Sequence, residues 1–340
     1  MFRIAIAFES RLGRHDGNPL YVTSFLKRME YYGKMLAGKG VDKRIESFFP
    51  LEQRGDSFYR KEDKAAYEAA KKLWDDKKEY VEVDHLAPTG DLSLFGKYDL
   101  FLDVDWGEDG LGGVLPYKCI DLPRPLAVWN SDTHLGYDYR LNKSKKADFV
   151  FCAQKRAVEE MKRDGVLNPI WLPHAVEPLA YPKTDYASKK YDVCFIGNLN
   201  SKNRVDALDR LFREFPNFYF GKKLFEDAAD TFSQSKIVFN ISMLDDINMR
   251  TFEAMASGSF LLTNWIPTIE ELFEDGKHLV LYRSEEEMIE KAKYYIAHDE
   301  ERERIAQAGY EEVIKNHTIQ ARVSRILDEV IPSKAPLAVA

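Results

Sequence analysis

Charged and polar side chains cluster between two apolar segments in the second half of the chain, Ile237–Ile241 and Phe260–Thr263. The apolar segments are typical of buried strands, and the residues between them predict a loop followed by a helix over 249–257. Such a unit directs backbone N–H groups and the positive end of the helix dipole at a ligand. An arginine fork matches phosphate oxygens, whereas carboxylates suit ribose or sugar hydroxyls. The cluster therefore predicts a nucleotide-sugar site made by Asp245, Asp246, Asn248, Arg250, Thr251 and Glu253.

Arg250 falls in the first turn of this predicted helix, where a cation opposes the helix dipole. Its position is unfavourable unless an anion binds there. Glu253 follows three residues later and shares a helix face with Arg250. The alternative interpretation is a simple surface pair between Arg250 and Glu253, with Phe252, Met255 and Ala256 facing the core.

A second candidate for phosphate binding, FIGNLNSKNR, follows the apolar segment Val193–Ile196. A glycine after a strand allows a tight turn, and the start of the next helix can face an anion. This pattern is also common in turns that bind no ligand. It therefore indicates a phosphate site only in combination with the cluster around Arg250. On that basis we assign donor contacts to Gly197, Asn198, Lys202 and Arg204.

A loop in the first half of the chain, AVWNSDTHLGYDYR, carries Asp132 and His134 beside Tyr137 and Tyr139. Histidine is suited to hydrogen bonding or proton relay near neutral pH. We therefore expect Asp132 and His134 to act at the reacting centre. The alternative is a structural turn in which the neighbouring aspartate satisfies the histidine.

Two further loops are candidates for acceptor binding, ESRLGRHDG after the first strand and LFLDVDWGEDGLGG. In the second loop, Asp103 and Asp105 form an Asp-x-Asp pattern that could hold a hard cation. Such short matches are frequent by chance, so we predict an acceptor-facing loop and no metal site. The predicted acceptor contacts are Glu9, Arg11, Arg14, His15 and Trp106.

The chain contains two successive series of alternating strands and helices. They are separated by the segment VEPLAYPKTDYASKKYD, whose apolar residues follow neither a helical nor a strand period. Near-continuous apolar runs such as Tyr98–Val104 predict strands that are covered on both faces. Two such series imply an α/β protein with two parallel-sheet domains facing a cleft. We place the first domain at 1–176, the linker at 177–190 and the second domain at 191–331, with the last helix packing back on the first domain.

Composition limits the class of protein. The chain has 340 residues, of which 45% are hydrophobic and 31% are charged, and its net charge of −7 weakens a nucleic-acid-binding interpretation. Cys119, Cys152 and Cys194 lie far apart without metal-ligand spacing, which predicts buried thiols in a reducing compartment. We expect neither a signal peptide nor an integral membrane segment, and thus a cytoplasmic protein.

The run from Tyr191 to about Arg322 resembles the glycosyltransferase-like domain of the spore maturation protein CgeB family. The matching pieces, in order, are DVCFIGN, SKIVFNIS, NMRTFEAMASGSFLLT, ELFEDGKHLVLY and IAQAGYEEVIKNHTIQAR. Proteins of this family look like relatives of the retaining glycosyltransferases of the GT-B fold. The resemblance implies two Rossmann-like domains, of which the second binds the nucleotide sugar and the first binds the acceptor.

The resemblance also implies roles for individual residues. In the larger group, two acidic residues separated by seven others flank the donor, and Asp245 and Glu253 have this spacing, with Asp in place of the usual first Glu. Glu253 would bind the ribose hydroxyls, while Asp245 or Asp246 would lie near the transferred sugar. His134 resembles a histidine that contacts the donor sugar. Asn198 stands where the group has an arginine, so Lys202, Arg204 or Arg250 must supply the charge for the diphosphate.

The sequence thus predicts a metal-independent, retaining glycosyltransferase of the hexosyltransferase type. We expect a UDP- or GDP-sugar as co-substrate, no cofactor, and a saccharide, protein or small-molecule acceptor. The alternatives are a nucleotide-sugar epimerase of the same fold, a phosphorylase, for which no pyridoxal lysine stands out, and a non-catalytic nucleotide-sugar-binding or coat protein.

Overall fold

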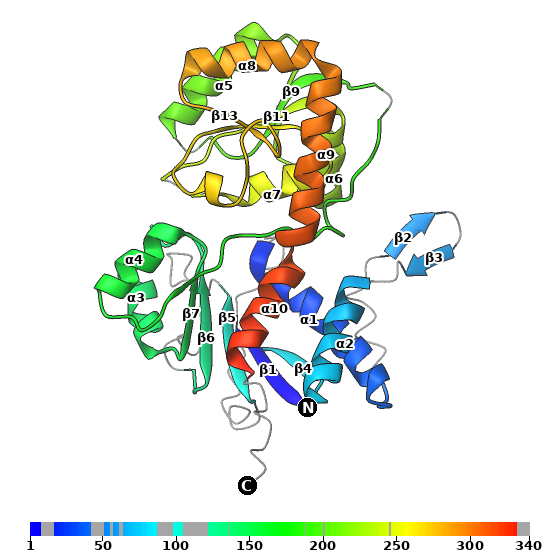
Figure 1. Cartoon of the computed structure of the whole chain (residues 1–340), viewed down its shortest axis with the longest axis vertical. Helices are drawn as coiled ribbons and strands as arrows, with labels where there is room; N and C mark the ends of the chain where they lie inside the picture. Colours follow the sequence, from blue (N-terminus) through cyan, green and yellow to red (C-terminus); the bar gives the residue numbers. More distant parts are fainter. Residues whose placement is uncertain are drawn as a thin grey trace. The chain divides into compact units, whose positions relative to one another are not determined.

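The computed structural model describes residues 1–7, 17–41, 51–54, 57–60, 64–86, 98–104, 122–134, 136–186, 188–199, 201–244 and 246–331. It is an α/β protein with two parallel sheets (Figure 1). The chain divides into two compact units. The first contains residues up to Pro173 together with the helix α10 (Ile319–Val330), and the second runs from His174 to Thr318.

The first unit is built on a six-stranded sheet in which every neighbouring pair is parallel. Every residue of the central strands β5 and β6 is buried, as the near-continuous apolar runs of the sequence predict. The strand order is β4 (Val81–Leu86), β1 (Phe2–Ala7), β5 (Leu100–Val104), β6 (Leu126–Asn130), β7 (Phe149–Cys152) and β8 (Ile170–Trp171).

Five helices cover this sheet, with α1, α2 and α10 on one side and α3 and α4 on the other (Figure 1). The helix α1 is amphipathic and faces the core with Val22, Phe25, Leu26 and Met29, which are all buried. The sequence analysis missed α3, the strand β4 and the antiparallel hairpin of β2 (Leu51–Arg54) and β3 (Ser57–Arg60). The other helix bounds are α1 (Gly17–Leu36), α2 (Lys64–Lys77), α3 (Tyr137–Lys146) and α4 (Lys155–Arg163).

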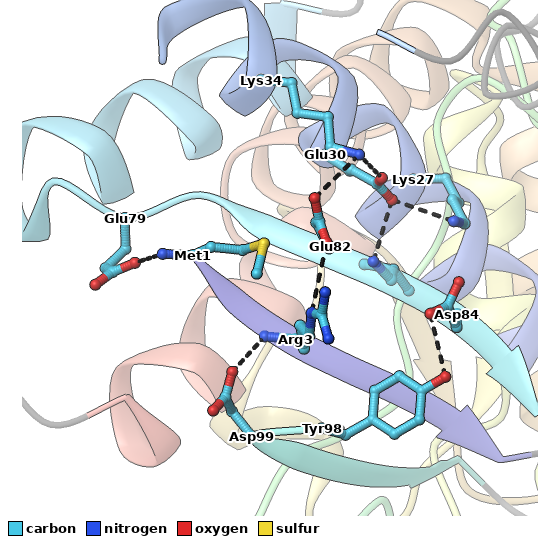
Figure 2. Close-up of polar contacts among 11 residues, drawn as sticks. Met1, Arg3, Lys27, Glu30, Lys34, Glu79, Glu82, Asp84, Tyr98 and Asp99 are labelled. Atoms are coloured by element: carbon cyan, nitrogen blue, oxygen red, sulfur yellow. Dashed lines mark hydrogen bonds and ion pairs between the residues drawn. The ribbon is translucent and has the colours of Figure 1, made fainter. Parts of the chain in front are cut away.

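A polar network ties α1 to the amino-terminal ends of β1 and β4 (Figure 2). Glu30 of α1 accepts hydrogen bonds from Lys34 Nζ at 2.7 Å and from the backbone N–H of Val83 at 3.1 Å. Lys34 also lies 3.3 Å from Glu82, which in turn lies 3.7 Å from Arg3. Burial by itself would lower the pKa of Lys34. The hydrogen bonds and negative charges of Glu30 and Glu82 outweigh this effect of burial, so the pKa of Lys34 is raised. This network therefore fixes the helix to the sheet at the edge opposite the carboxyl ends of the strands.

The second unit has a five-stranded, all-parallel sheet. Its order is β10 (Phe218–Gly221), β9 (Tyr191–Ile196), β11 (Ser235–Asn240), β12 (Leu261–Asn264) and β13 (Val280–Tyr282). The direction of winding reverses between β9 and β11, because β10 is added on one side of β9 and the later strands on the other. In open parallel sheets, ligands bind beyond the carboxyl ends of the strands at such a reversal. The reversal therefore directs attention to the loops after β9 and β11.

The helices of the second unit form a layer on each face of its sheet, with α5 and α8 on one side and α6 and α7 on the other (Figure 1). Apolar side chains of α5 and α8, including Leu211 and Met288, pack with Phe195 and Phe239 in one buried cluster. The bounds are α5 (Lys202–Glu214), α6 (Phe225–Ser233), α7 (Met249–Ala256), the short 3₁₀ helix η4 (Ile269–Glu271), α8 (Glu285–Ala297) and α9 (Asp299–Asn316).

The segment predicted as a linker contacts the second unit at several points. Tyr181 is buried. Lys183 Nζ donates to Gln307 Oε1 at 2.9 Å, and Lys189 Nζ donates to the carbonyl of Ser233 at 2.8 Å. We therefore describe residues 177–186 and 188–190 as part of the second unit.

Two of the three cysteines lie in the described part of the chain. Cys152 and Cys194 are buried free thiols, as predicted, and burial raises the pKa of each to about 12. Cys119 lies outside the described residues. Within the described ranges, no helix combines the length and the apolar character that a membrane span requires.

Candidate functional site

Gly197 is the first residue after β9. One aromatic and one cationic side chain, those of Phe195 and Arg250, lie close to its backbone. A Cβ added at this position would lie 2.9 Å from Phe195 Cζ and 3.4 Å from Arg250 Nη1. The first distance is shorter than a carbon–carbon contact allows. A glycine therefore leaves room here for the Phe195 ring, and Arg250 contacts the same position from the other loop.

Arg204 joins the loops that follow β9 and β11. Its guanidinium donates from Nη1 to the carbonyl of Asn198 and from Nη2 to the carbonyl of Ile241, both at 2.9 Å. The side chain is buried in the first turn of α5, where Ser201 accepts a hydrogen bond from the Arg204 backbone N–H at 3.3 Å. Burial and the nearby charge of Arg250 lower the pKa of Arg204, so an anion between the two arginines would offset their repulsion.

Arg250 stands at the start of α7 and is partly accessible, with 21% of its side chain exposed. Its guanidinium carbon lies 5.7 Å from the centre of the Phe232 ring. Its Nε donates to Glu253 Oε2 at 3.2 Å, whereas Nη1 is the atom that faces Gly197. Part of the guanidinium thus lies at the loop after β9, where the sequence predicts phosphate contacts.

Glu253 is held between two donors, and only 8% of its side chain is exposed. Arg250 donates to Oε2, and the hydroxyl of Tyr181 donates to Oε1 at 2.9 Å. The ion pair of the alternative interpretation is thus present, and Phe252, Met255 and Ala256 are buried as it expects, but Glu253 lies largely below the surface. The sequence analysis missed Tyr181. Its one available signal was an aromatic residue in an otherwise polar segment with no secondary-structure period.

Asn248 and Thr251 anchor the start of α7 to the sheet. Asn248 has extended backbone at the N-cap position, yet its side chain does not cap the helix and donates instead to Asn240 Oδ1 at 3.1 Å. Asn240 Nδ2 in turn reaches Thr263 Oγ1 at 3.1 Å and Thr251 Oγ1 at 3.5 Å. Because the cap residue is used elsewhere, the first turn of α7 keeps backbone N–H groups that no cap side chain covers, which suits an anion.

Of the other residues predicted to bind the donor, one is buried and two are exposed. Asp246 is the buried residue, and its backbone N–H donates to the carbonyl of Met243 at 3.0 Å. Asn198 is exposed. Lys202 is 86% exposed at the start of α5, where it pairs with Asp206 at 2.7 Å. Asp245 lies outside the described residues.

In the first unit, the loop after β6 holds the predicted pair Asp132 and His134. Asp132 is half-buried and has a φ of 45°, a left-handed conformation that is uncommon for a residue other than glycine. His134 is exposed. Thr133, between them, is buried and donates from Oγ1 to Gln154 Oε1 at 3.1 Å. The loop is thus attached at its centre, with His134 accessible to a ligand.

Asp103, near the carboxyl end of β5, is engaged by a lysine that the sequence analysis did not single out. Lys143 of α3 donates to Asp103 Oδ2 at 3.0 Å, and both side chains are fully buried. The ammonium group balances the carboxylate charge that a metal ion would otherwise neutralise. Asp105 and all the predicted acceptor contacts lie outside the described residues, namely Glu9, Arg11, Arg14, His15 and Trp106.

Residues 187–328 match a protein-family model described as glycosyl transferase-like. The match spans most of the second unit, including the loops after β9 and β11 and the helix α7. No curated protein sequence matches the chain.

Solved structures similar to the whole chain share its fold at low sequence identity. An alpha-glucosyltransferase in complex with UDP-glucose and DNA has a TM-score of 0.61 at 12% identity. HepE of Anabaena in complex with UDP and glucose has a TM-score of 0.57 at 15% identity, and the sucrose-phosphate synthase of Thermosynechococcus elongatus has 0.54 at 12%. Each comparison covers 97% of this chain and 99% of the other. The chain therefore has the GT-B fold.

Proposed function

We propose that this protein is a glycosyltransferase that moves a sugar from a nucleotide-diphospho-sugar to an acceptor. The observation that carries the proposal is the position of Arg250. Its partly exposed guanidinium lies against the glycine loop at the winding reversal of the second sheet, beside the buried cation Arg204 and the carboxylate Glu253. This combination of two cations and a carboxylate supports binding of a diphosphate next to a ribose.

The donor roles follow from these contacts. Arg250 and the uncapped first turn of α7 bind the diphosphate, while Arg204 holds the two loops together and adds positive charge. A departing nucleoside diphosphate gains negative charge as the glycosidic bond breaks, and preorganised cations stabilise that charge. Glu253 accepts hydrogen bonds from the ribose hydroxyls, since a carboxylate offers about four acceptor positions and two are in use.

The residues nearer the chemistry are Asp245, Asp246, Asp132 and His134, which position the transferred sugar. The first unit binds the acceptor, which is a saccharide, a protein or a small molecule. We further propose that the reaction is retaining and needs no metal, and that the protein is cytoplasmic and of the CgeB type. These finer assignments rest on the family resemblance, except for the compartment, which rests on the spacing of the cysteines and the apolar pattern of the sequence.

The donor is a UDP- or GDP-sugar, and UDP is favoured. The structures of HepE and of the alpha-glucosyltransferase, which share this fold, hold UDP or UDP-glucose. At such low identity this likeness supports the choice of the first donor to test rather than the sugar itself.

A donor screen tests the proposal. Thermal unfolding is followed with UDP, GDP and a panel of their sugars, and the stabilising donors are then assayed for release of the nucleoside diphosphate. We expect at least one donor to raise the unfolding temperature and to be hydrolysed slowly without acceptor. Epimerised nucleotide sugar as the product would instead support an epimerase, binding without turnover would support a non-catalytic protein, and no stabilisation by any donor would overturn the proposal.

A further inference from the structure

The hydroxyl of Tyr181 connects the segment between the two sheets to the donor site. Tyr181 is 3% exposed and lies seven residues after the chain enters the second unit at His174. It donates to Glu253 Oε1 at 2.9 Å from a position 72 residues earlier in the chain. Tyr181 is thus a non-local restraint on the carboxylate to which the proposed function assigns the ribose.

The other partner of Glu253 cannot provide such a restraint by itself. Arg250 is only three residues away on the same helix, and it contacts Glu253 through Nε alone. Arginine and carboxylate groups readily form two parallel hydrogen bonds when both oxygens are available. Tyr181 donates to Oε1 from outside α7, so the orientation of the carboxylate is fixed by two donors from different parts of the chain, while Arg250 Nη1 lies at the loop that begins with Gly197.

The chain around Tyr181 is itself fixed to the second unit. Before it, the backbone N–H of Val176 donates to the carbonyl of His317 at 3.1 Å. After it, Lys183 contacts Gln307, and its ammonium lies 5.2 Å from the centre of the Tyr310 ring. The hydroxyl is therefore presented to Glu253 from a segment held on both sides.

We propose that Tyr181 is a positioning residue of the donor site. Its hydrogen bond orients Glu253 towards the ribose hydroxyls. The inference rests on the proposed function, because it needs a nucleotide at this site.

The substitution Tyr181→Phe removes only the hydroxyl, and Tyr186→Phe is its matched control. Tyr186 lies in the same segment and also donates to a carboxylate, that of Asp230, but it is exposed and belongs to another contact. Calorimetry with UDP and 2′-deoxy-UDP, and with GDP and 2′-deoxy-GDP, measures how much the ribose 2′-hydroxyl adds to the nucleotide affinity of each variant. Unfolding temperatures are recorded in parallel.

For the wild type and Tyr186→Phe we expect the ribonucleotide to bind about tenfold more tightly than its deoxy form, as for a hydrogen bond to a charged group. For Tyr181→Phe and Glu253→Ala, the ratio of ribonucleotide affinity to deoxynucleotide affinity should fall to nearly one. The Tyr181→Phe variant should stay folded at the assay temperature. A retained preference in Tyr181→Phe, whether or not its unfolding temperature falls, would overturn the positioning role.

The two proposals fail differently. If the wild type binds no nucleotide, both the proposed function and the role of Tyr181 are lost. If the wild type shows no ribose preference, or Glu253→Ala keeps it, the ribose role of Glu253 is wrong, and the role of Tyr181 falls with it. If Glu253→Ala loses the preference and Tyr181→Phe keeps it, only the inference about Tyr181 is wrong.

Discussion

The carboxyl edges of the two sheets hold their charged side chains in different ways. In the first unit, Asp103 and Lys143 form a fully buried pair at 3.0 Å. In the second unit, Arg250 remains 21% exposed, and its charge adds to that of the buried Arg204. A pair closed off from solvent belongs to the folded structure, whereas Arg250 pairs with Glu253 through Nε and keeps part of its guanidinium accessible to a ligand.

Solvation explains the difference. Removing two opposite charges from water is costly, and the cost is offset only when each charge keeps its partner. Two neighbouring arginines in a partly buried site repel each other, and the lowered pKa of Arg204 reflects both burial and this repulsion. Binding an anion would relieve it. The comparison therefore predicts that substitutions at the first edge change stability and that substitutions at the second edge change nucleotide binding.

Lys143→Met should give the largest effect, because it leaves Asp103 buried without its cation. We expect the free energy of unfolding to fall by about 3–5 kcal/mol, measured by urea denaturation. Lys71→Met is the control, since Lys71 forms an exposed pair with Asp75. Adding Asp103→Leu to Lys143→Met should recover much of the loss. A loss no larger than that of the control would show that the pair is not structural.

Arg250→Ala should lower kcat/KM by about 100-fold, as expected when a preorganised donor to a developing charge is removed. The assay is nucleoside diphosphate release from the donor found by the screen. Arg213→Ala, which removes an exposed arginine of the same unit that pairs with Asp209, should leave the rate unchanged. Equal effects of the two substitutions would remove the distinction between the two sheet edges.

Gly197→Ala should weaken nucleotide binding by about tenfold, because the added methyl group lies too close to Phe195 and shifts the loop that Arg250 contacts. Calorimetry measures the affinity, and thermal unfolding separates it from a loss of stability. Gly276→Ala is unsuitable as a control, because that glycine has a φ of 74°. Gly40→Ala is suitable, since a Cβ at Gly40 meets nothing within 4 Å. Unaltered affinity in Gly197→Ala would show that Arg250 does not need this close approach.

Lys202→Ala should have the smallest effect, since the side chain is 86% exposed and pairs with Asp206 one turn along the same helix. Such pairs contribute about 0.3–0.5 kcal/mol to stability. We expect nucleotide affinity within about twofold of the wild type, a change well below one power of ten. A loss as large as that of Arg250→Ala would assign the diphosphate contact to Lys202 as well.

Elements with a strong local period were predictable, and those that depend on distant packing were not. The buried strands β5, β9 and β11 and the helix α7 lie where the apolar patterns predict them. The helix α3 was missed because its sequence, YDYRLNKSKK, carries few apolar residues, and its start at Gly136 has no side-chain cap. Its place is set by Lys143 and the bond from Asn130 Nδ2 to Ser144 Oγ at 3.0 Å.

The sequence by itself determined the α/β class, the parallel sheets and the shared helix face of Arg250 and Glu253, because these depend on periodicity and on residues one helical turn apart. The tertiary structure alone decided which charges are balanced. Lys143 meets Asp103 across 40 residues and Tyr181 meets Glu253 across 72. No local pattern encodes such contacts, since they arise only when packed elements bring distant side chains together. The same packing separates a closed structural pair in the first unit from an accessible arginine in the second.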